Sequence, residues 1–84
     1  MYTVYALYAP KHDKIYIGYT SNLEQRLLSH NKLGKKGWTI KFRPWELAYS
    51  EEVESKTEAM KREKQLKTAR GREFVWEKVR EKFN

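Results

Sequence analysis

Two side chains suited to phosphate chemistry stand close together in the first third of the chain. Arg26 and His30 are four residues apart, so on a helix they share one stripe at the border of the apolar face. Arginine offers a permanently charged planar fork that matches the oxygens of a phosphate, and histidine can orient, protonate or hydrogen-bond the same group. Tyr16 lies in the β-prone stretch just before this helix. The pattern indicates a site at the rim of the core, although a lone arginine or histidine at a helix edge is more often structural.

A glutamate on an otherwise apolar helix face is the second chemical signal. The predicted helix 55–67 carries Ala59, Met60 and Leu66 on one face, and Glu63 falls in the middle of that face. A buried carboxylate is costly unless it is paired or bound to a cation, so Glu63 should have a specific partner. One interpretation is a salt bridge to an arginine or lysine at the border of the core. The other is a ligand for Mg²⁺ or Mn²⁺, which prefer carboxylate oxygen and retain water.

The scarcity of other converging acids limits the chemistry. Asp13 is the only aspartate and lies in an expected turn, and the remaining glutamates fall at helix caps, on a strand or on exposed faces. Because a two-metal site needs several convergent acids, we expect hydrolysis with a single metal ion. Covalent catalysis is not indicated, since the chain has no cysteine and neither Ser21 nor Ser29 has a base in a suitable pattern.

Composition and charge define the class of protein and of partner. Eighty-four residues with twelve aromatic side chains (3 Trp, 6 Tyr, 3 Phe) predict one folded domain, residues 1–84, with a thin core. The net charge of +7 favours a polyanionic partner, nucleic acid first and an acidic membrane surface second. No apolar run approaches the roughly 18 residues of a membrane helix, and no signal-peptide pattern is present, so we expect a cytoplasmic protein without a membrane partner.

The elements that must position these side chains follow from hydrophobic periodicity and turn signals. We predict strands at 2–8, 14–19 and 45–52 and helices at 21–33, 55–67 and 72–83. Ser21 and Ser55, each with a glutamate three residues later, predict capping boxes, and Gly71 marks the end of the second helix or the turn beyond it. The fold class is α+β: a small three-stranded antiparallel sheet flanked by helices, in the order β-β-α-β-α-α.

The order and spacing of these residues resemble one nuclease superfamily. Val4-Tyr5 precedes Tyr16-Ile17-Gly18, which begins eleven residues after Tyr5; Arg26 follows Tyr16 by ten residues, and Glu63 lies near the end of the chain. This arrangement resembles the GIY-YIG endonucleases, especially small stand-alone members related to the N-terminal nuclease domain of an excinuclease. Thr3 stands where the first motif of that family has glycine.

The resemblance implies a metal-dependent endonuclease that hydrolyses phosphodiester bonds in DNA with one Mg²⁺ or Mn²⁺ ion, and DNA repair is a setting in keeping with it. The implied catalytic residues are Tyr5, Tyr16, Arg26, His30 and Glu63. Glu63 would bind the metal ion and Arg26 would stabilise the transition state. Tyr5 would take a proton from the attacking water, although an unperturbed phenol has a pKa of about 10. Tyr16 would hold that base or the water, and Gly18 would leave space.

A long stretch without acids suggests where the substrate lies. Residues 25–45 contain no aspartate or glutamate but six lysines and arginines, with Trp38 and Phe42 interleaved, which suits backbone neutralisation and base stacking. A solvated basic loop with its aromatic residues on the core is an equal alternative. The expected substrate-binding residues are Gly18, Tyr19, Lys35, Lys36, Trp38, Lys41, Arg43 and Lys67.

Two other functions remain open from the sequence. A non-catalytic, basic nucleic-acid-binding module on the same fold would use the charge without the carboxylate. An adaptor that docks a protein partner through Trp76 on the last helix is the third class. We expect a monomer or a weak homo-oligomer, with weak sequence specificity because no module for reading base edges is present.

Overall fold

The computed structural model describes residues 1–33 and 38–83, apart from the side chains of Leu33 and Trp38. Its strands are β1 (Tyr2–Ala9), β2 (Lys14–Thr20) and β3 (Glu46–Val53), and its α-helices are α1 (Leu23–Leu28), α2 (Lys56–Leu66) and α3 (Ala69–Phe83). A π-helical turn, Ser29–Leu33, extends α1, and a 3₁₀ helix spans Trp38–Phe42. The strands form an antiparallel sheet in the order β2-β1-β3. The predicted α+β fold with its order of elements is confirmed.

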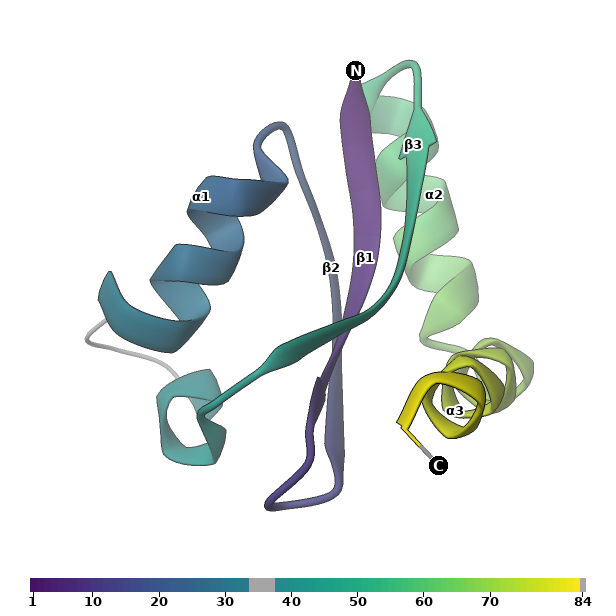
Figure 1. Cartoon of the computed structure of the whole chain (residues 1–84). Coiled ribbons are helices and arrows are strands. Elements are labelled where there is room, and N and C mark those ends of the chain that lie inside the picture. Colours follow the sequence, from purple (N-terminus) through teal and green to yellow (C-terminus); the bar gives the residue numbers. More distant parts are fainter. Residues whose placement is uncertain (34–37, 84) are drawn as a thin grey trace.

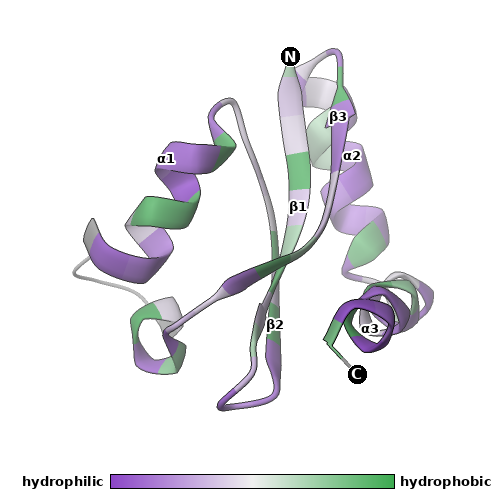
Figure 2. Ribbon diagram, in the orientation of Figure 1, coloured by the Kyte–Doolittle hydropathy of each residue, from purple (hydrophilic) through white to green (hydrophobic). Residues whose placement is uncertain are grey.

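The central strand β1 divides the core in two because its side chains alternate between the faces of the sheet. Val4 and Ala6 pack with α2 and α3 on one face. Tyr5 and Leu7 pack with Trp45 and with Leu23 and Leu27 of α1 on the other. Figure 1 shows α1 on one side of the sheet and α2 and α3 on the opposite side. The long helices carry mostly hydrophilic residues, interrupted by a few apolar positions (Figure 2), so each helix contributes only a narrow apolar stripe to a thin core.

A β-bulge interrupts the pairing of β3 with β1. Ala6 pairs with Tyr49 whereas Leu7 pairs with Leu47, so Ala48 is the extra residue. Ala48 and Tyr49 therefore both pack toward α2 and α3, while Leu47 packs toward α1. The bulge lets one short strand supply apolar side chains to both halves of the core.

Asn22, and not Ser21, caps the first helix. The Asn22 side chain accepts a hydrogen bond from the backbone N–H of Gln25 at 3.1 Å, and Ser21 is exposed. The predicted capping box of Ser21 with Glu24 was therefore wrong by one position. The reason is the preceding turn, in which the Thr20 hydroxyl accepts from the Asn22 N–H at 3.1 Å and delays the first helical residue to Leu23.

The second helix begins as expected. Ser55 caps it by accepting from the Glu58 N–H at 3.2 Å. The Glu58 carboxylate accepts in return from the backbone N–H of Glu54 at 3.3 Å, one residue before the position that a capping box would give it. The cap itself is thus confirmed, and only its return hydrogen bond is shifted.

Gly71 lies inside the third helix and lets it cross closely over the end of α2. A Cβ atom built on Gly71 would stand 2.1 Å from the carbonyl oxygen of Gln65 and 2.4 Å from the Cα of Leu66. The prediction that the helix starts at Arg72 was wrong, because α3 already begins at Ala69. The glycine is required by the approach of another backbone, not by a helix end.

Replacing Gly71 by alanine should destabilise the protein, although glycine-to-alanine changes in unobstructed helices usually stabilise. The added methyl group collides with backbone atoms that cannot turn aside, so we expect a loss of roughly 2–3 kcal/mol in the free energy of unfolding. Urea denaturation measures it, with Arg70→Ala on the exposed side of the same turn as the control. A Gly71→Ala protein as stable as that control would contradict the close crossing.

The cap of the first helix can be tested by a neighbouring pair of substitutions. Asn22→Ala should cost about 1 kcal/mol in the free energy of unfolding because it leaves the Gln25 N–H without its acceptor. Ser21→Ala should change stability by less than about 0.5 kcal/mol. Denaturation of the two variants side by side would reject the assignment if Ser21→Ala were the costlier change.

Candidate active site

Tyr5 stands at the centre of the candidate site and is completely buried, with 0% of its surface exposed. It pairs across β1 and β2 with Gly18. A Cβ atom on Gly18 would lie 2.9 Å from the Tyr5 hydroxyl oxygen and 3.1 Å from a ring carbon of Tyr16. The missing side chain of Gly18 thus provides the space in which the Tyr5 hydroxyl lies beside the edge strand.

The imidazole of His30 meets both tyrosines from the π-helical turn after α1. The Tyr5 hydroxyl and His30 Nε2 lie 3.1 Å apart, and Tyr5 donates this hydrogen bond when His30 carries its proton on Nδ1. The ring of His30 meets the ring of Tyr16 edge-on, with centroids 4.7 Å apart. His30 is 8% exposed. Two phenols and one imidazole therefore form a compact aromatic cluster on the α1 side of the sheet.

The Arg26 guanidinium lies on the solvent side of this cluster. Hydrogen bonding to Tyr5, together with the nearby Tyr5 and Tyr16 hydroxyls, raises the pKa of Arg26 above its ordinary value. The arginine itself is exposed. The helix thus brings Arg26 and His30 onto one site, as their spacing predicts, with the permanent charge outward and the imidazole inward.

Glu63 reaches the same region from α2, on the opposite side of the sheet. Its negative charge is one of the causes that raise the pKa of Tyr5, which places the carboxylate within electrostatic range of the phenol. Its side chain is 22% exposed and its oxygen lies 3.6 Å from Lys67 Nζ. Met60 is 42% exposed, so Glu63 borders the buried stripe of Ala59 and Leu66 and does not lie in its middle.

Burial controls the protonation of the central pair. Burial raises the pKa of Tyr5 to about 12; hydrogen bonding by Arg26 opposes this rise, and the charges of Tyr16 and Glu63 add to it. Burial also lowers the pKa of His30 below 6.5, helped by the positive charges of Arg26 and Arg43. Near neutral pH the pair is therefore a protonated phenol beside a neutral imidazole.

The expected substrate-binding residues are scattered. Lys35 and Lys36 lie outside the described residues, as does the side chain of Trp38. Lys41 is exposed, and Tyr19 lies on the opposite face from Tyr5, with its ring 6.3 Å from that of Tyr2. Of the described members of this set, Gly18, Arg43 and Lys67 lie next to residues of the candidate site.

Arg43 is bonded to the turn that carries His30. Its guanidinium donates to the backbone carbonyls of His30 and, at 3.1 Å, of Ser29. Cationic side chains commonly satisfy the last carbonyls of a helix in this way. Arg43 therefore helps to hold the turn in place.

Asn31 is a positioning residue that the sequence pattern did not indicate. Its side-chain amide donates to the carbonyl of Trp45 at 2.9 Å and accepts from the Trp45 N–H at 2.6 Å. The indole of Trp45 donates to the carbonyl of Thr39 at 2.8 Å. These bonds fasten the segment before β3 to the helical turn next to His30. Hydrogen bonds between a side chain and a backbone fourteen residues away leave no pattern in the local sequence by which they could be predicted.

The single acid near the site suits a metal ion that keeps most of its waters, and not one enclosed by protein ligands alone. Among residues 1–33 and 38–83, no group of three or more histidines, cysteines or acids could enclose a metal ion. Among these described residues, Glu63 is the one acid whose charge is among the causes that raise the pKa of Tyr5. Mg²⁺ is commonly bound by one or two carboxylates together with waters and substrate phosphates. The donor set therefore fits a single ion shared with a phosphate substrate.

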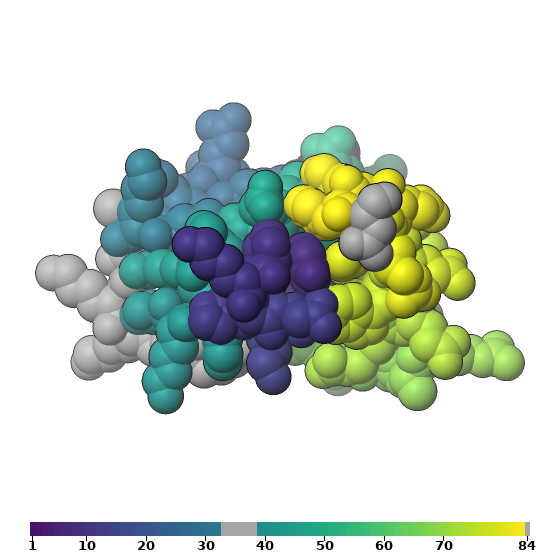
Figure 3. Space-filling model, turned by 60° about the horizontal axis from the view of Figure 1, so that its bottom comes forward, coloured from purple at the N-terminus to yellow at the C-terminus, as the bar shows by residue number. Residues whose placement is uncertain are grey.

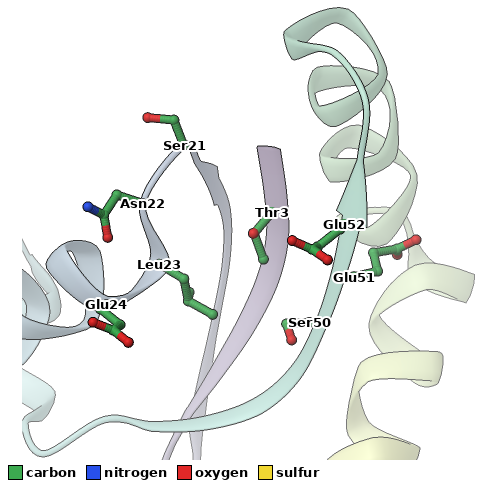
Figure 4. Close-up of a pocket in the computed structure, with 8 residues that line it drawn as sticks. All are labelled: Thr3, Ser21, Asn22, Leu23, Glu24, Ser50, Glu51 and Glu52. Atoms are coloured by element: carbon green, nitrogen blue, oxygen red, sulfur yellow. The ribbon is translucent and has the colours of Figure 1, made fainter. Parts of the chain in front are cut away.

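A hollow of about 660 Å³ lies outside the candidate site, between the start of α1 and β3. Figure 4 shows Glu24 and Glu52 bordering it with Thr3 and Ser50, whereas Glu51 turns away toward Arg62, 2.7 Å from its Nε. Like charges make this groove unsuitable for a phosphate chain. No helix among the residues that the structure describes is both long and apolar enough to cross a bilayer.

Comparison with known proteins finds one matching family and several small relatives. Residues 1–77 match a family model described as the GIY-YIG catalytic domain. A UPF0213 protein of Staphylococcus haemolyticus is 43% identical over 58 residues, covering 69% of this chain and 71% of the relative. A UPF0213 protein of Bacillus velezensis is 37% identical over 73 residues, covering 83% of this chain and 74% of the relative. One of the archaeon Natronomonas pharaonis is 36% identical over 56 residues, covering 67% of this chain and 66% of the relative. No solved structure is significantly similar.

The raised pKa of Tyr5 predicts a specific loss of stability in alkali. The unfolded chain releases the phenolic proton near the ordinary value of 10.0 and the folded chain at about 12, so Tyr5 favours the folded state fully below pH 10 and ceases to do so as pH rises through 12. At about pH 11 the decline should reach about 1 kcal/mol. Urea denaturation of wild type and Tyr5→Phe across this range separates it from lysine titration, which both share. Parallel pH dependences would show that Tyr5 ionises normally.

Proposed function

Because the chain belongs to the GIY-YIG catalytic domain family, we propose that it is a metal-dependent endonuclease that hydrolyses phosphodiester bonds in DNA. One observation carries the proposal: the buried Tyr5 hydroxyl occupies the space left by Gly18 and hydrogen-bonds to His30 at 3.1 Å and to Arg26, while the charge of Glu63 acts on it from a third element. A purely binding surface has no use for a carboxylate beside a phosphate site, because it would repel the ligand.

Arg26 receives the scissile phosphate. Arg26 is an exposed residue, and its guanidinium can offer two parallel donors to the non-bridging oxygens, where negative charge increases in the transition state. In the free protein the same guanidinium hydrogen-bonds to Tyr5, which has no exposed surface. Exchange of this hydrogen bond for a phosphate oxygen would free the Tyr5 hydroxyl to meet the attacking water.

Tyr5 then acts as the base together with His30. A phenol with a pKa of about 12 is almost fully protonated at neutral pH, so it needs a group that takes its own proton. Neutral His30 presents Nε2 at 3.1 Å from the hydroxyl oxygen. As the water oxygen bonds to phosphorus, its proton passes to the Tyr5 oxygen and the Tyr5 proton to His30. The bond to the leaving oxygen breaks, and that oxygen takes a proton from solvent.

Glu63 would hold one Mg²⁺ or Mn²⁺ ion. When bound, the ion would stabilise charge on the leaving oxygen and cancel the negative charge that raises the pKa of Tyr5. Tyr16 packs against His30 and keeps the imidazole directed at Tyr5. Gly18 contributes space, since any side chain there would displace the hydroxyl of Tyr5.

The wider setting follows from the charge and from the relatives. A net charge of +7 favours a nucleic-acid partner, here DNA. The relatives named above come from bacteria and an archaeon, whose DNA lies in the cytoplasm, so we place the protein there. We propose a role in DNA repair for a monomer or weak homo-oligomer that has weak sequence specificity and uses DNA structure or a protein partner for selection.

Cleavage of supercoiled plasmid or branched DNA with Mg²⁺ or Mn²⁺ tests the proposal. Wild type should nick the DNA, and Glu63→Gln, Arg26→Ala and Tyr5→Phe should each reduce the rate on the order of 100-fold or more, because each removes a group that the proposed transition state needs. Glu77→Gln, an exposed position on α3, is the matched control and should cleave normally.

Binding of the same DNA without metal separates the competing functions. Glu63→Gln should bind at least as tightly as wild type, since a negative charge has been removed beside the phosphate. A wild-type protein that binds but never nicks would be a non-catalytic binding module. Nicking that survives both Glu63→Gln and Arg26→Ala would come from another site or a contaminant.

A further inference from the structure

Two adjoining hollows, together called the groove here, lie along the outer edge of β2 beside the candidate site. Its first part, about 220 Å³, is lined by Ile15, Tyr16, Ile17, Lys67 and Arg72. Its second part, about 410 Å³, shares Ile15 and Arg72 with the first and continues between Phe42 and Trp76. Because Tyr16 also borders the candidate site, the groove begins where the chemistry would take place. Figure 3 looks onto the far end, where the turn between β1 and β2 lies between segment 38–45 and α3.

The groove is lined by positive charge, whereas the hollow of Figure 4 is bordered by glutamates. Three exposed cations line it: Lys14, Lys67 and Arg72. Its one acid, Asp13, accepts a hydrogen bond from the Tyr8 hydroxyl at 2.9 Å. Among the described residues the Arg72 guanidinium has no ion-pair partner, so it is available to an external anion.

The floor and the edge of the groove also suit a nucleic-acid strand. Ile15 and Ile17 provide an apolar floor below the cations. Within the described sheet β2 pairs with β1 alone, and an edge strand presents unpaired backbone N–H groups on its outer side. Backbone N–H groups, lysine and arginine are the usual partners of phosphate oxygens, and such contacts fix the register of a strand without reading its sequence.

We propose that this groove is a subsite for the sugar-phosphate backbone on one side of the cleaved linkage, and that Arg72 and Lys67 bind its first phosphate there. The assignment of the ligand rests on the proposed nuclease function. Lys67 connects the subsite to the catalytic carboxylate, because its Nζ lies 3.6 Å from Glu63 in the free protein. The strand runs from Tyr16 toward Lys14 and away from Glu24 and Glu52 on the other face of the molecule.

Fluorescence anisotropy of a labelled DNA oligonucleotide, in EDTA so that nothing is cleaved, tests the subsite. Arg72→Ala should weaken binding on the order of tenfold at low salt and reduce the slope of log K against log salt by about 1, the share of one phosphate contact. Lys67→Ala should act in the same direction. Arg70→Ala removes the same charge two positions away, outside the groove, and should leave the slope nearly unchanged. Equal slopes for Arg72→Ala and Arg70→Ala would overturn the subsite.

Substrates shortened on one or the other side of the cut provide a second measurement. The cleavage penalty of Arg72→Ala should vanish when the nucleotides on the groove side are missing and persist when those on the other side are missing. Arg72→Lys should restore part of the salt slope, since the charge remains. A penalty that is independent of substrate length on both sides would place Arg72 outside the path of the strand.

The two proposals fail in different ways. Wild type that binds DNA with an Arg72-dependent slope but never cleaves it would support the groove as a nucleic-acid site and reject the nuclease. Efficient cleavage with no effect of Arg72→Ala or Lys67→Ala would support the nuclease and reject the groove. Absence of any DNA binding would reject both.

Discussion

The buried hydroxyl of Tyr5 is the constraint around which this small structure is arranged. A polar atom without exposed surface needs hydrogen-bond partners, and Tyr5 finds them in His30 and Arg26, both carried by the segment of α1. The space for the hydroxyl exists only because β1 and β2 pair so that Gly18 stands opposite. A register slip of one residue would turn Tyr5 to the other face. Strand pairing, helix placement and the candidate site are therefore set by the same few contacts.

Residues without a chemical role hold the reactive ones in place. Arg43 caps the turn after α1 through the carbonyls of Ser29 and His30. Asn31 binds both backbone groups of Trp45, and Trp45 packs beneath Tyr16, with ring centroids 6.3 Å apart. This second layer fixes the imidazole relative to the phenol, and the proposed proton transfer would require the two atoms at hydrogen-bond distance.

Much of the fold could be predicted because its determinants are local. Alternation along β1 assigned Tyr5 and Val4 to opposite faces, and Ser55 marked the start of α2. The cap of α1 could not be chosen, since Ser21 and Asn22 have similar capping preferences and the deciding bond comes from the turn at Thr20. Gly71 was misjudged for a related reason: the atoms that exclude a side chain there belong to another helix.

The proximity of the candidate site residues was easier to predict than their surroundings. Spacing joined Arg26 to His30, and the apolar pattern around Glu63 indicated an unusual carboxylate, although Met60 is exposed and Glu63 only borders the core. The charge pattern gave no sign that Arg43 donates to carbonyls thirteen and fourteen positions away. Contacts over such separations depend on how the chain closes on itself, which periodicity does not encode.

The opposite signs of the two grooves have a consequence for how the molecule meets its ligand. Glu24 and Glu52 lie together on one face, while Lys14, Lys67 and Arg72 follow the edge of β2. A polyanion therefore exerts a torque as well as an attraction on the approaching protein. A nucleic acid bound as proposed would therefore meet the protein already rotated, with the basic edge leading, and fewer collisions would occur in unproductive orientations.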